Sequence, residues 1–442
     1  MSEWKFLTLK EAELEFIDGD RGVNYPKKSE LLAEGDCVFL NTGNVRQNSF
    51  DFSNLDFITK EKDNLLRNGK LQRDDIVLTT RGTVGNVALY SQEVPFSNIR
   101  INSGMVIIRV NKNFWNPYFI YLFFQSHFFK KQISRLISGS AQPQLPISIL
   151  ETVSIPQLTL DEQKEIIFNI KSIDHKIQIN NQINRELEDM AKTLYDYWFV
   201  QFDFPDQNGK PYKSSGGKMV YHPELKREIP EGWGVTTFSS WIADNKTGDW
   251  GKESSQGNYT LEVDCIRGAD INGLSGNGKT DMPTRFILEK NQNKLLTDFD
   301  IVIEISGGSS TQSTGRIVGI SENVLNRFEL PLICSNFCKA VSLNEQETFY
   351  NFLYEWKNLY DNGVLFSWEG KTSGIKNLLF DSFVTNYHIV QPPIDLMKQF
   401  FDYAFSVDKK IQLLLKQNQE LTQLRDWLLP MLMNGQVKVK KE

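Results

Sequence analysis

The chain has 442 residues, of which 24% are charged and 40% hydrophobic, and its formal net charge is −6. This length exceeds what one hydrophobic core normally holds, so we expect two to four domains. The slightly acidic balance excludes attraction of nucleic acid through bulk charge, so any DNA binding would need local basic patches. Four scattered cysteines favour a reducing compartment, and no apolar stretch is as long as a membrane span, so we expect a soluble cytoplasmic protein with no membrane partner.

Residues 1–155 are predicted to form a first globular domain. Short runs of β-branched and aromatic residues alternate with turn residues there, which is typical of strands. Asn-Pro-Tyr-Phe at 116–119 resembles the Asn-Pro-Pro-Tyr tetrapeptide of adenine methyltransferases, but no glycine-rich cofactor loop precedes it. We therefore favour a helix start with Asn116 as N-cap, and predict a helix from about Tyr118 to Ile137. The predicted strands are 37–40, 75–80, 86–90 and 104–110.

Residues 156–200 are predicted to contain one long helix, because apolar residues recur at alternating spacings of four and three between 161 and 199. Its length would be roughly 58 Å at 1.5 Å per residue. Such a helix is unstable alone, so its apolar stripe needs a partner. Two asparagines interrupt the stripe. Either Asn180 and Asn184 lie in the seam, where buried amides fix register, or the helix rotates and Ile179 and Ile183 face inward.

The partner helix is predicted in the same chain, at residues 391–435. A constant shift of 234 residues aligns Asp174 with Asp408, and further identities follow without a gap. A match of this length indicates an internal repeat. The predicted seam of the two helices is formed by Ile166, Ile170, Ile173, Ile177, Leu187 and Leu194 in the first, and by Phe400, Val407, Ile411, Leu414, Leu421 and Leu428 in the second.

The rest of the chain completes a twofold pattern. Residues 201–230 are rich in Gly, Pro, Ser and Lys and are predicted to be a linker, 231–390 a second globular domain, and 436–442 a short tail. Asp36-Cys37 reappears at 264–265, although the shifts between the domains drift. The predicted fold class is α+β (mixed α/β): two globular domains joined by two long antiparallel helices, with a pseudo-twofold repeat.

Two local patterns resemble chemical sites but favour other interpretations. Gly-Leu-Ser-Gly-Asn-Gly-Lys-Thr at 273–280 matches the phosphate-binding loop of nucleoside triphosphatases, yet Pro283 follows where a helix should begin. We interpret it as an exposed glycine-rich turn. Cys334 and Cys338 have no second cysteine pair, so we expect buried thiols and no metal site.

Three stretches resemble the specificity subunits of type I restriction–modification enzymes. They are Ile-Pro-Gln-Leu at 155–158 followed by Asp-Glu-Gln at 161–163, Tyr-Trp-Phe-Val at 197–200, and Gly-Lys-Pro-Tyr-Lys-Ser-Ser-Gly-Gly at 209–217. The resemblance covers nearly the whole chain. One departure is at residues 391–397, where the second helix begins without the Glu-Gln pair of the first.

The resemblance implies a non-catalytic subunit whose two target-recognition domains each read one half of a split, asymmetric double-stranded DNA site. It implies that the two helices act as a spacer and dock two methyltransferase (M) subunits, and that restriction (R) subunits join through M. The chain itself would need no cofactor. S-adenosylmethionine, ATP and Mg would be bound by the partner subunits.

Bases are read by Arg, Lys, Asn, Gln, Ser and Thr side chains on loops, and phosphates by basic side chains and backbone N–H groups. Loops of this composition occur three times in each domain. An ordinary solvated loop is the alternative for any single residue. The predicted DNA-binding residues are Asn44, Arg46, Gln47, Arg81, Thr83, Asn86, Ser140, Gln142 and Gln144 in the first domain, and Arg267, Asp270, Asn272, Arg316, Lys371 and Lys376 in the second.

Two other functions remain open from the sequence. One is a nucleoside triphosphatase that uses residues 273–280, and the other is a coiled-coil adaptor without DNA selectivity. The acidic balance of the second domain leaves open whether that domain is a working reader.

Overall fold

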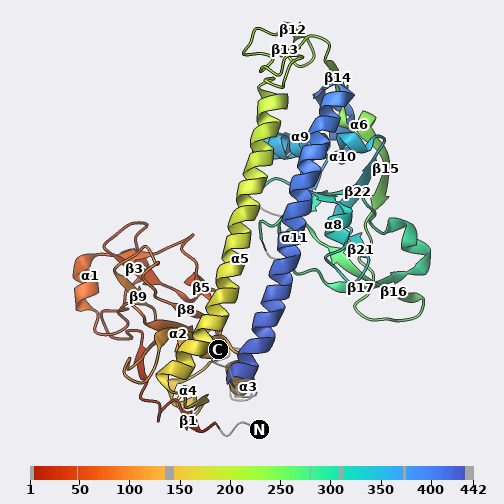
Figure 1. Ribbon diagram of the computed structural model, residues 1–442. Helices are drawn as coiled ribbons and strands as arrows, with labels where there is room; N and C mark the ends of the chain where they lie inside the picture. The colour runs from red at the N-terminus through yellow and green to blue at the C-terminus, as the bar shows by residue number, and fades with distance from the viewer. Residues whose placement is uncertain are drawn as a thin grey trace. The chain divides into compact units, whose positions relative to one another are not determined.

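The computed structural model describes residues 4–46, 48–134, 144–278, 280–307, 312–371 and 375–433 (Figure 1). It divides into two compact units, Met1–Lys176 with Glu420–Glu442 (unit 1) and Ile177–Gln419 (unit 2). Two long helices, α5 (Leu160–Tyr195) and α11 (Ile394–Met433), each contribute residues to both units. The predicted fold class, mixed α/β with two long helices, is confirmed.

Unit 1 contains a domain built on a four-stranded antiparallel sheet in the order β2-β10-β7-β8. A smaller sheet has the order β6-β3-β9, with β3 and β9 parallel, and β1 pairs with β11 just before α5. The elements are β1 (Phe6–Thr8), β2 (Glu15–Asp18), η1 (Lys28–Glu30), β3 (Cys37–Leu40), η2 (Thr42–Asn44), β4 (Val45–Arg46), β5 (Ser49–Phe50), β6 (Phe57–Ile58), α1 (Lys60–Leu65), β7 (Ile76–Thr79), β8 (Val87–Leu89), β9 (Ile99–Ile101), β10 (Met105–Arg109), α2 (Pro117–Gln125), α3 (His127–Ser134), α4 (Ile147–Leu150) and β11 (Ser154–Pro156).

The helix predicted over 118–137 begins as expected but does not run through. The Asn116 side chain accepts a hydrogen bond from Tyr118 N, and Pro117 occupies the first turn, so the predicted cap is confirmed. The continuous helix is wrong, because it breaks at buried Ser126. The Ser126 hydroxyl accepts a hydrogen bond from Phe129 N at 3.2 Å and so starts α3 as a new helix.

Unit 2 repeats this plan with longer connections. Its four-stranded sheet has the order β15-β22-β18-β20, its smaller sheet β17-β16-β21 has one parallel pair, and β14 pairs with β25 just before α11. The elements are η3 (Asp196–Val200), β12 (Met219–His222), β13 (Arg227–Pro230), β14 (Gly234–Thr237), α6 (Phe238–Trp241), β15 (Ile242–Thr247), β16 (Tyr259–Ile266), η4 (Gly268–Asp270), α7 (Ile271–Leu274), β17 (Thr284–Leu288), η5 (Glu289–Lys294), β18 (Asp300–Glu304), β19 (Ser306–Gly307), β20 (Ile317–Ile320), α8 (Glu322–Leu325), β21 (Leu332–Cys334), β22 (Cys338–Leu343), η6 (Gln346–Thr348), α9 (Phe349–Asp361), η7 (Val364–Trp368), β23 (Glu369–Lys371), β24 (Lys376–Leu378), α10 (Phe380–Asn386) and β25 (His388–Gln391).

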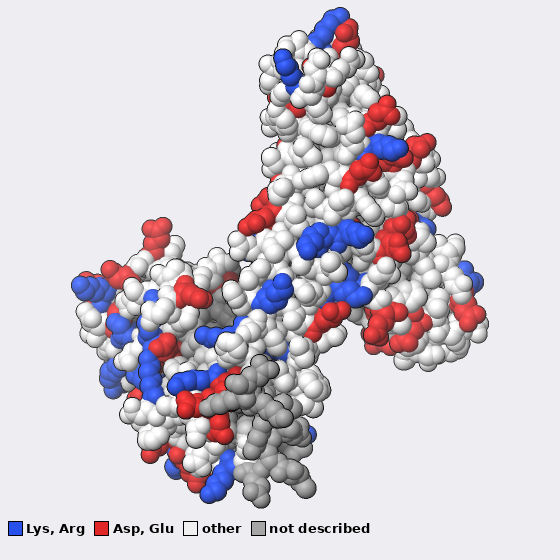
Figure 2. Space-filling model, viewed as in Figure 1, with Lys and Arg blue, Asp and Glu red and all other residues white. Residues whose placement is uncertain are grey.

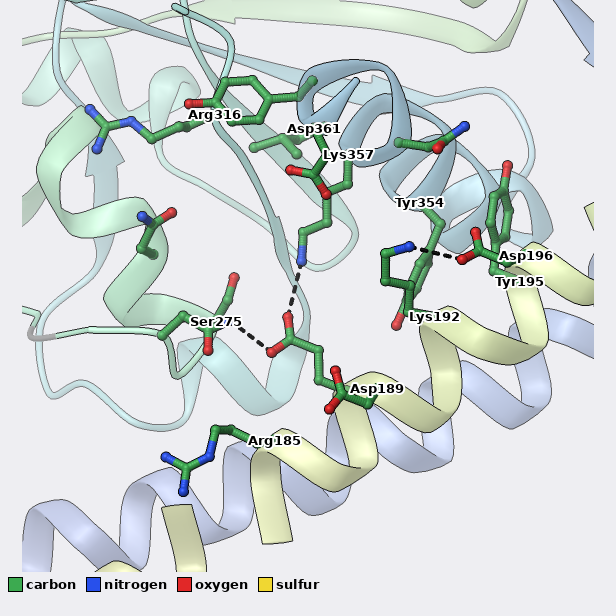
Figure 3. A pocket seen from close by; sticks show the side chains of 16 residues that line it. Arg185, Asp189, Lys192, Tyr195, Asp196, Ser275, Arg316, Tyr354, Lys357 and Asp361 are labelled. Atoms are coloured by element: carbon green, nitrogen blue, oxygen red, sulfur yellow. Dashed lines mark hydrogen bonds and ion pairs between the residues drawn. The ribbon is translucent and has the colours of Figure 1, made fainter. Parts of the chain in front are cut away.

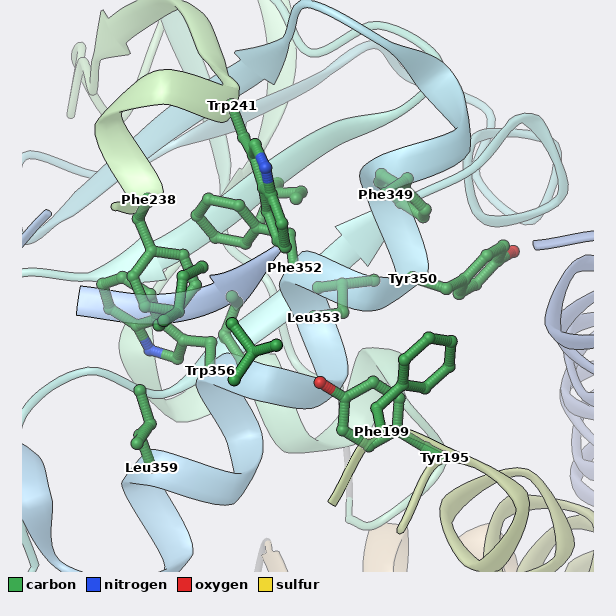
Figure 4. Close-up of a cluster of buried hydrophobic side chains, with 14 of the residues drawn as sticks. Tyr195, Phe199, Phe238, Trp241, Phe349, Tyr350, Phe352, Leu353, Trp356 and Leu359 are labelled. Atoms are coloured by element: carbon green, nitrogen blue, oxygen red, sulfur yellow. The ribbon is translucent and has the colours of Figure 1, made fainter. Parts of the chain in front are cut away.

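The core of unit 2 is unusually rich in aromatic side chains. Phe238 packs edge-on against Phe352 and Trp356, and Trp356 meets Phe383 at nearly a right angle (Figure 4). Tyr195, near the end of α5, belongs to the same buried cluster. Burial of these large rings ties α5 and α9 to the second domain, since each aromatic side chain removes a large apolar area from water.

Residues 201–230, predicted as a linker from their composition, are a folded part of unit 2. Phe204 stacks between Tyr212 and Trp233, with ring centroids 4.7 and 5.0 Å away. The Asp203 carboxylate accepts hydrogen bonds from the N–H and the hydroxyl of Ser214 at 2.7 and 2.5 Å. The strands β12 and β13 then form a hairpin. The Gly and Pro residues therefore shape tight turns in an ordered segment.

Within each unit the two long helices run antiparallel. In unit 2 the Asn180 amide donates hydrogen bonds of 2.8 Å to Gln417 Oε1 and to Asn418 Oδ1, while Ala191 packs in one cluster with Val407. Partner numbers thus fall along α11 as they rise along α5. In unit 1, likewise, Asp174 pairs with Arg425 and Ile166 lies in one cluster with Leu432. Every predicted seam residue is buried or half-buried.

The question of the two seam asparagines is settled by burial. Asn180 is fully buried and Asn184 is 6% exposed, whereas Ile179 is 38% exposed. The helix therefore does not rotate, and the amides lie in the seam.

The segment at 273–280 lacks the geometry of a phosphate-binding loop. Its first glycine lies inside the short helix α7, and coil leads from Thr280 to β17, so no helix N-terminus is available for phosphate. Gly273 and Leu274 are buried, which differs from the predicted exposed turn, while Asn277 and Gly278 are exposed. Lys279 lies outside the described residues. Among the helices that the structure describes, none is both long and apolar enough to span a membrane.

Candidate nucleic-acid interface

In unit 1 the structure brings two of the predicted residues together at the end of β7. Arg81 and Gln144 form an isolated antiparallel bridge, and the neighbouring Leu145 N donates to Thr80 O at 3.0 Å. Both Arg81 and Gln144 are exposed. The Arg81 guanidinium has no hydrogen bond or ion pair with any residue of the described ranges. A cation and an amide are therefore presented side by side to solvent.

The hairpin β4–β5 lies next to this bridge. Asn86, in the loop after β7, donates from its amide to Val45 O at 2.9 Å and so joins the two loops. Arg46 on β4 is 61% exposed, and its Nε lies 3.0 Å from Asp51 Oδ2. Hydrogen bonds from Ser53, and then from Arg46, lower the pKa of Asp51 to about 2, so the ion pair holds at neutral pH. Thr83 is exposed in the same region.

Two predicted residues, one in each domain, turn inward. Asn44 closes η2, is buried, and donates from its amide to two backbone carbonyls at 2.8 and 3.1 Å. Asp270 closes η4 in the same way, is 1% exposed, and accepts hydrogen bonds from Arg267. Arg267 is held by this pair, with Nε 2.9 Å from Asp270 Oδ2. Asn44 and Asp270 thus shape their loops from within.

Asn86 in the first domain and Arg316 in the second occupy equivalent positions, and each anchors the loop that follows β7 or β18. The register of β7 with β8 and of β18 with β20 makes Asn86 and Arg316 equivalent. Arg316 forms two hydrogen bonds, of 2.9 and 2.6 Å, with buried Glu304, and these raise the pKa of Arg316. Because this guanidinium is neutralised inside its own domain, little of its charge is left for DNA.

Arg316 also lines a cavity of about 390 Å³ that is bounded by α5, α7 and α9 within unit 2 (Figure 3). Exposed Asn272 lines it too. Several charges of the cavity are already paired, Lys192 with Asp196 at 2.8 Å and Lys357 with Glu188 at 3.4 Å. The cavity is therefore polar, and these two of its lysines are already neutralised by carboxylates.

The remaining predicted residues are distributed as follows. Lys376 on β24 pairs with Glu369 at 3.1 Å, and its ammonium lies 5.1 Å from the ring of Phe366. Lys371 lies on β23, directly across from Lys376. Gln47, Ser140 and Gln142 lie outside the described residues, as does the side chain of Lys371.

Sequence reasoning missed the second-domain counterparts of Arg81 and Gln144. Ser306 bridges Asn377, and Leu378 N donates to Ile305 O at 2.9 Å, which reproduces the pattern of the first domain. The Ser306 hydroxyl also donates to Asn377 Oδ1. Gln144 and Asn377 are 233 residues apart, whereas Arg81 and Ser306 are 225 apart. The two shifts differ mainly because the loop between β18 and β20 is longer than the loop between β7 and β8.

Comparison with known proteins relates the first part of the chain to one family. Residues 1–189 match the family described as the type I restriction modification DNA specificity domain. The chain is a relative of type I specificity subunits. The resemblance predicted from the sequence is thereby confirmed.

Specificity subunits from distant organisms match most of the chain. The MjaIX specificity subunit of Methanocaldococcus jannaschii is 26% identical over 373 residues, which cover 83% of this chain and 78% of that protein. The HindI specificity subunit of Haemophilus influenzae is 24% identical over 486 residues, covering 99% of this chain and 100% of that protein. A crystal structure of a type I S subunit from M. genitalium has the same fold, with a TM-score of 0.52, 17% identity, and coverage of 98% and 96%.

The surface of the chain has no uniformly basic face in the view of Figure 2. On the face shown in Figure 2, Lys and Arg side chains are interspersed with Asp and Glu in both units. Among the described residues no group of three or more His, Cys, Asp or Glu side chains is arranged to hold a metal ion. Cys334 and Cys338 are buried free thiols, and burial raises the pKa of Cys334 to about 12. These thiols are therefore uncharged at neutral pH.

Proposed function

We propose that this chain is the cytoplasmic DNA-specificity subunit of a type I restriction–modification complex, and that each domain reads one half of a two-part, asymmetric DNA site. One observation carries the proposal. Equivalent backbone positions at the end of β7 and β18 carry different polar side chains, Arg81 with Gln144 in the first domain and Ser306 with Asn377 in the second. Arg selects guanine, whereas Ser and amide side chains select other bases, so the same edge would read two different half-sites.

The two long helices would set the spacing of the half-sites and dock two M subunits. The exposed apolar residues of each helix include a pair eleven positions apart. These are Ile179 and Met190 on α5, and Leu413 and Leu424 on α11. Eleven residues are three helical turns, so Ile179 and Met190, both in unit 2, lie on one side of α5. The repeat shift of 234 residues relates the two pairs, which is what two equal docking sites require.

Catalysis would then belong to the partners. The M subunits would bind S-adenosylmethionine and methylate an adenine that is flipped out of each half-site, and R subunits, with ATP and Mg, would join through M. This chain would contribute geometry and base selection. The geometry of residues 273–278 gives the triphosphatase alternative no support.

The experiment is single-molecule methylome sequencing of cells that express this chain with the M subunit of its own organism, against cells that express M alone. We expect a new two-part methyladenine motif that requires this chain. If the complex forms and neither methylates nor binds any sequence selectively, the proposal fails and the adaptor function stands.

Exchange of parts then separates the two roles. Replacing residues 1–155 by the first domain of another specificity subunit should change one half-site only. Deleting one heptad from both α5 and α11 should change the spacer and keep both half-sites. An altered half-site after the heptad deletion would contradict the spacer role of the helices.

A further inference from the structure

Beside the proposed base-reading residues, the two domains differ in the size of one side chain, at a position that is not among the polar candidates. In the first domain Thr80 N and Arg81 N both donate to the carbonyl of Gly104, at 2.9 and 3.1 Å. In the second domain Ile305 N and Ser306 N both donate to the carbonyl of Phe337, at the same two distances. Phe337 therefore stands where the first domain has Gly104, directly beside the proposed base-reading pair.

The neighbourhood explains why the two residues differ in size. A Cβ atom at Gly104 would lie 2.7 Å from Thr42 Cγ2, so the first domain has no room for a side chain there. The residue equivalent to Thr42, at the start of η4, is Gly268. The second domain thus has no side chain at this position of η4, and it has an aromatic side chain at Phe337 in the loop 335–337.

Among the described residues of unit 2, the ring of Phe337 takes part in no hydrophobic cluster. The residue is 55% exposed. A single exposed apolar side chain is ordinary on a protein surface. It is the place of Phe337, whose carbonyl accepts from Ile305 N and Ser306 N beside the proposed base-reading pair, that points to contact with a ligand.

We propose that Phe337 is a specificity-determining residue of the second domain, and that it contacts the C5-methyl group of a thymine in the half-site which that domain reads. This inference rests on the proposed DNA-reading function. Thymine alone presents a methyl group in the major groove, and Phe is among the side chains that recognise it by apolar contact. The first domain, with Gly104 and with an Arg81 guanidinium that has no partner among the described residues, reads its half-site without this contact.

The test removes the methyl group from the DNA and the ring from the protein. The chain in complex with M binds duplexes that carry its own two-part site, in which thymines of the second half-site are replaced one at a time by deoxyuridine. We expect about a fivefold loss of affinity at one position, the size expected for one buried methyl group. Phe337→Ala should bind the thymine duplex as weakly as the normal chain binds the uracil duplex, with no further loss on uracil.

Matched variants guard against misfolding. Phe337→Leu keeps an apolar contact and should retain part of the preference for thymine. Tyr221→Ala removes an aromatic ring that is 61% exposed on β12 and should leave the preference unchanged.

Three results would overturn the inference: no effect of uracil at any position, an equal loss for Phe337→Ala on thymine and uracil duplexes (a wedge between base pairs), or a second half-site without an A·T pair. In each case the first half-site is still read, so the proposed function stands. If no sequence is read at all, both proposals fail.

Discussion

Two asparagines on α5, four residues apart, are both buried in the seam but differ in their hydrogen bonding. The amide nitrogen of Asn180 donates two hydrogen bonds of 2.8 Å to α11. Neither polar atom of the Asn184 side chain has a partner among the described residues. The antiparallel register explains this, since moving four residues forward from Asn180 moves four back from Asn418 and places Leu414 opposite Asn184. A buried amide without partners costs about 1–3 kcal/mol.

Replacing Asn184 by Leu should therefore stabilise unit 2, by about 1–2 kcal/mol, because Leu has the same branching and meets Leu414 with an apolar surface. Calorimetric unfolding of the chain measures this. Asn180→Leu is the matched control and should lower stability, because it removes two hydrogen bonds. If both variants unfold alike, the register given for the seam is wrong.

A buried carboxyl makes the stability of unit 2 depend on pH. Glu355 on α9 accepts a hydrogen bond from the Tyr195 hydroxyl at 2.8 Å, and burial of its carboxyl group raises its pKa above the usual 4.5. The folded state therefore binds this proton more tightly than the unfolded state. The resulting stability is complete below about pH 4.5 and is lost as pH rises through the folded pKa.

Glu355→Gln keeps the acceptor for Tyr195 and removes the charge. We expect the variant to be more stable than the normal chain at pH 7.5, and the difference to shrink towards pH 4.5. Thermal unfolding midpoints across this range test the sign. A variant that is less stable at pH 7.5 would show that the charged carboxylate is favourable where it lies.

Residue types on the loops could be predicted from the sequence, but the direction in which each side chain points could not. Asn44 and Asp270 looked like base readers and instead close their own loops. Asn86 and Arg316 were likewise predicted as DNA-binding residues, but their side chains make contacts inside their own domains. Whether a polar side chain turns inward depends on carbonyls and carboxylates supplied by distant segments, and these have no local signature.

Among the elements, the start of α5 shows what the Glu-Gln pair of the sequence does. Glu162 accepts hydrogen bonds from Thr159 and caps the helix. Gln163, fully buried, accepts from Asn116 N at 2.8 Å and donates to the carbonyls of Phe114 and Leu158 at 2.9 and 3.0 Å. This one side chain ties α5 to the start of α2.

Gln163→Ala should destabilise unit 1 by about 2–4 kcal/mol, because it leaves three buried backbone groups without their partner. Glu162→Ala, on the exposed side of the same turn, should cost about 1 kcal/mol, the usual value of a cap. Urea unfolding measures the loss in the free energy of unfolding for each variant, and so distinguishes a buried hydrogen-bonding side chain from an exposed helix cap. Equal losses would contradict the role given to Gln163.

The second helix begins differently for a packing reason. The repeat shift places Met397 at the position of Gln163, and Met397 is 1% exposed in the aromatic core of unit 2. Where α5 is held at its start by the hydrogen bonds of Gln163, α11 is therefore held by the apolar packing of Met397. That the two proposed M docking sites also differ stays a prediction.

Long periodic elements could be read from the sequence, and short irregular ones could not. The heptad pattern predicted α5 and α11 nearly to the residue, and the strand at 37–40 is observed as β3. The break at Ser126 depends on one hydroxyl. The segment 201–230 has the composition of a linker, but Phe204 and Trp233 order it through contacts that no local pattern predicts.

At the scale of the whole molecule, the proposed function and the repeat together predict one M subunit for each pair of exposed apolar residues. Changing Ile179 and Met190 together to Glu should abolish one surface, and changing Leu413 and Leu424 should abolish the other. Native mass spectrometry should then find one M subunit with either double variant and none when both are combined. Exposed positions of this kind tolerate charge, so folding is preserved. Two M subunits on either double variant would contradict the proposed surfaces.

The mismatch in the seam also has a consequence for what half of this chain could do alone. By the repeat, Asn184 corresponds to Asn418 and Leu414 to Asn180. If two copies of the N-terminal half paired through α5, Asn180 of each would face Asn184 of the other, and both amide contacts would form. If two copies of the C-terminal half paired through α11, Leu414 of each would face Asn418 of the other, and neither asparagine would face an amide. Loss of the second half would thus leave a self-complementary protein, and under the proposed function two identical domains would read a palindrome.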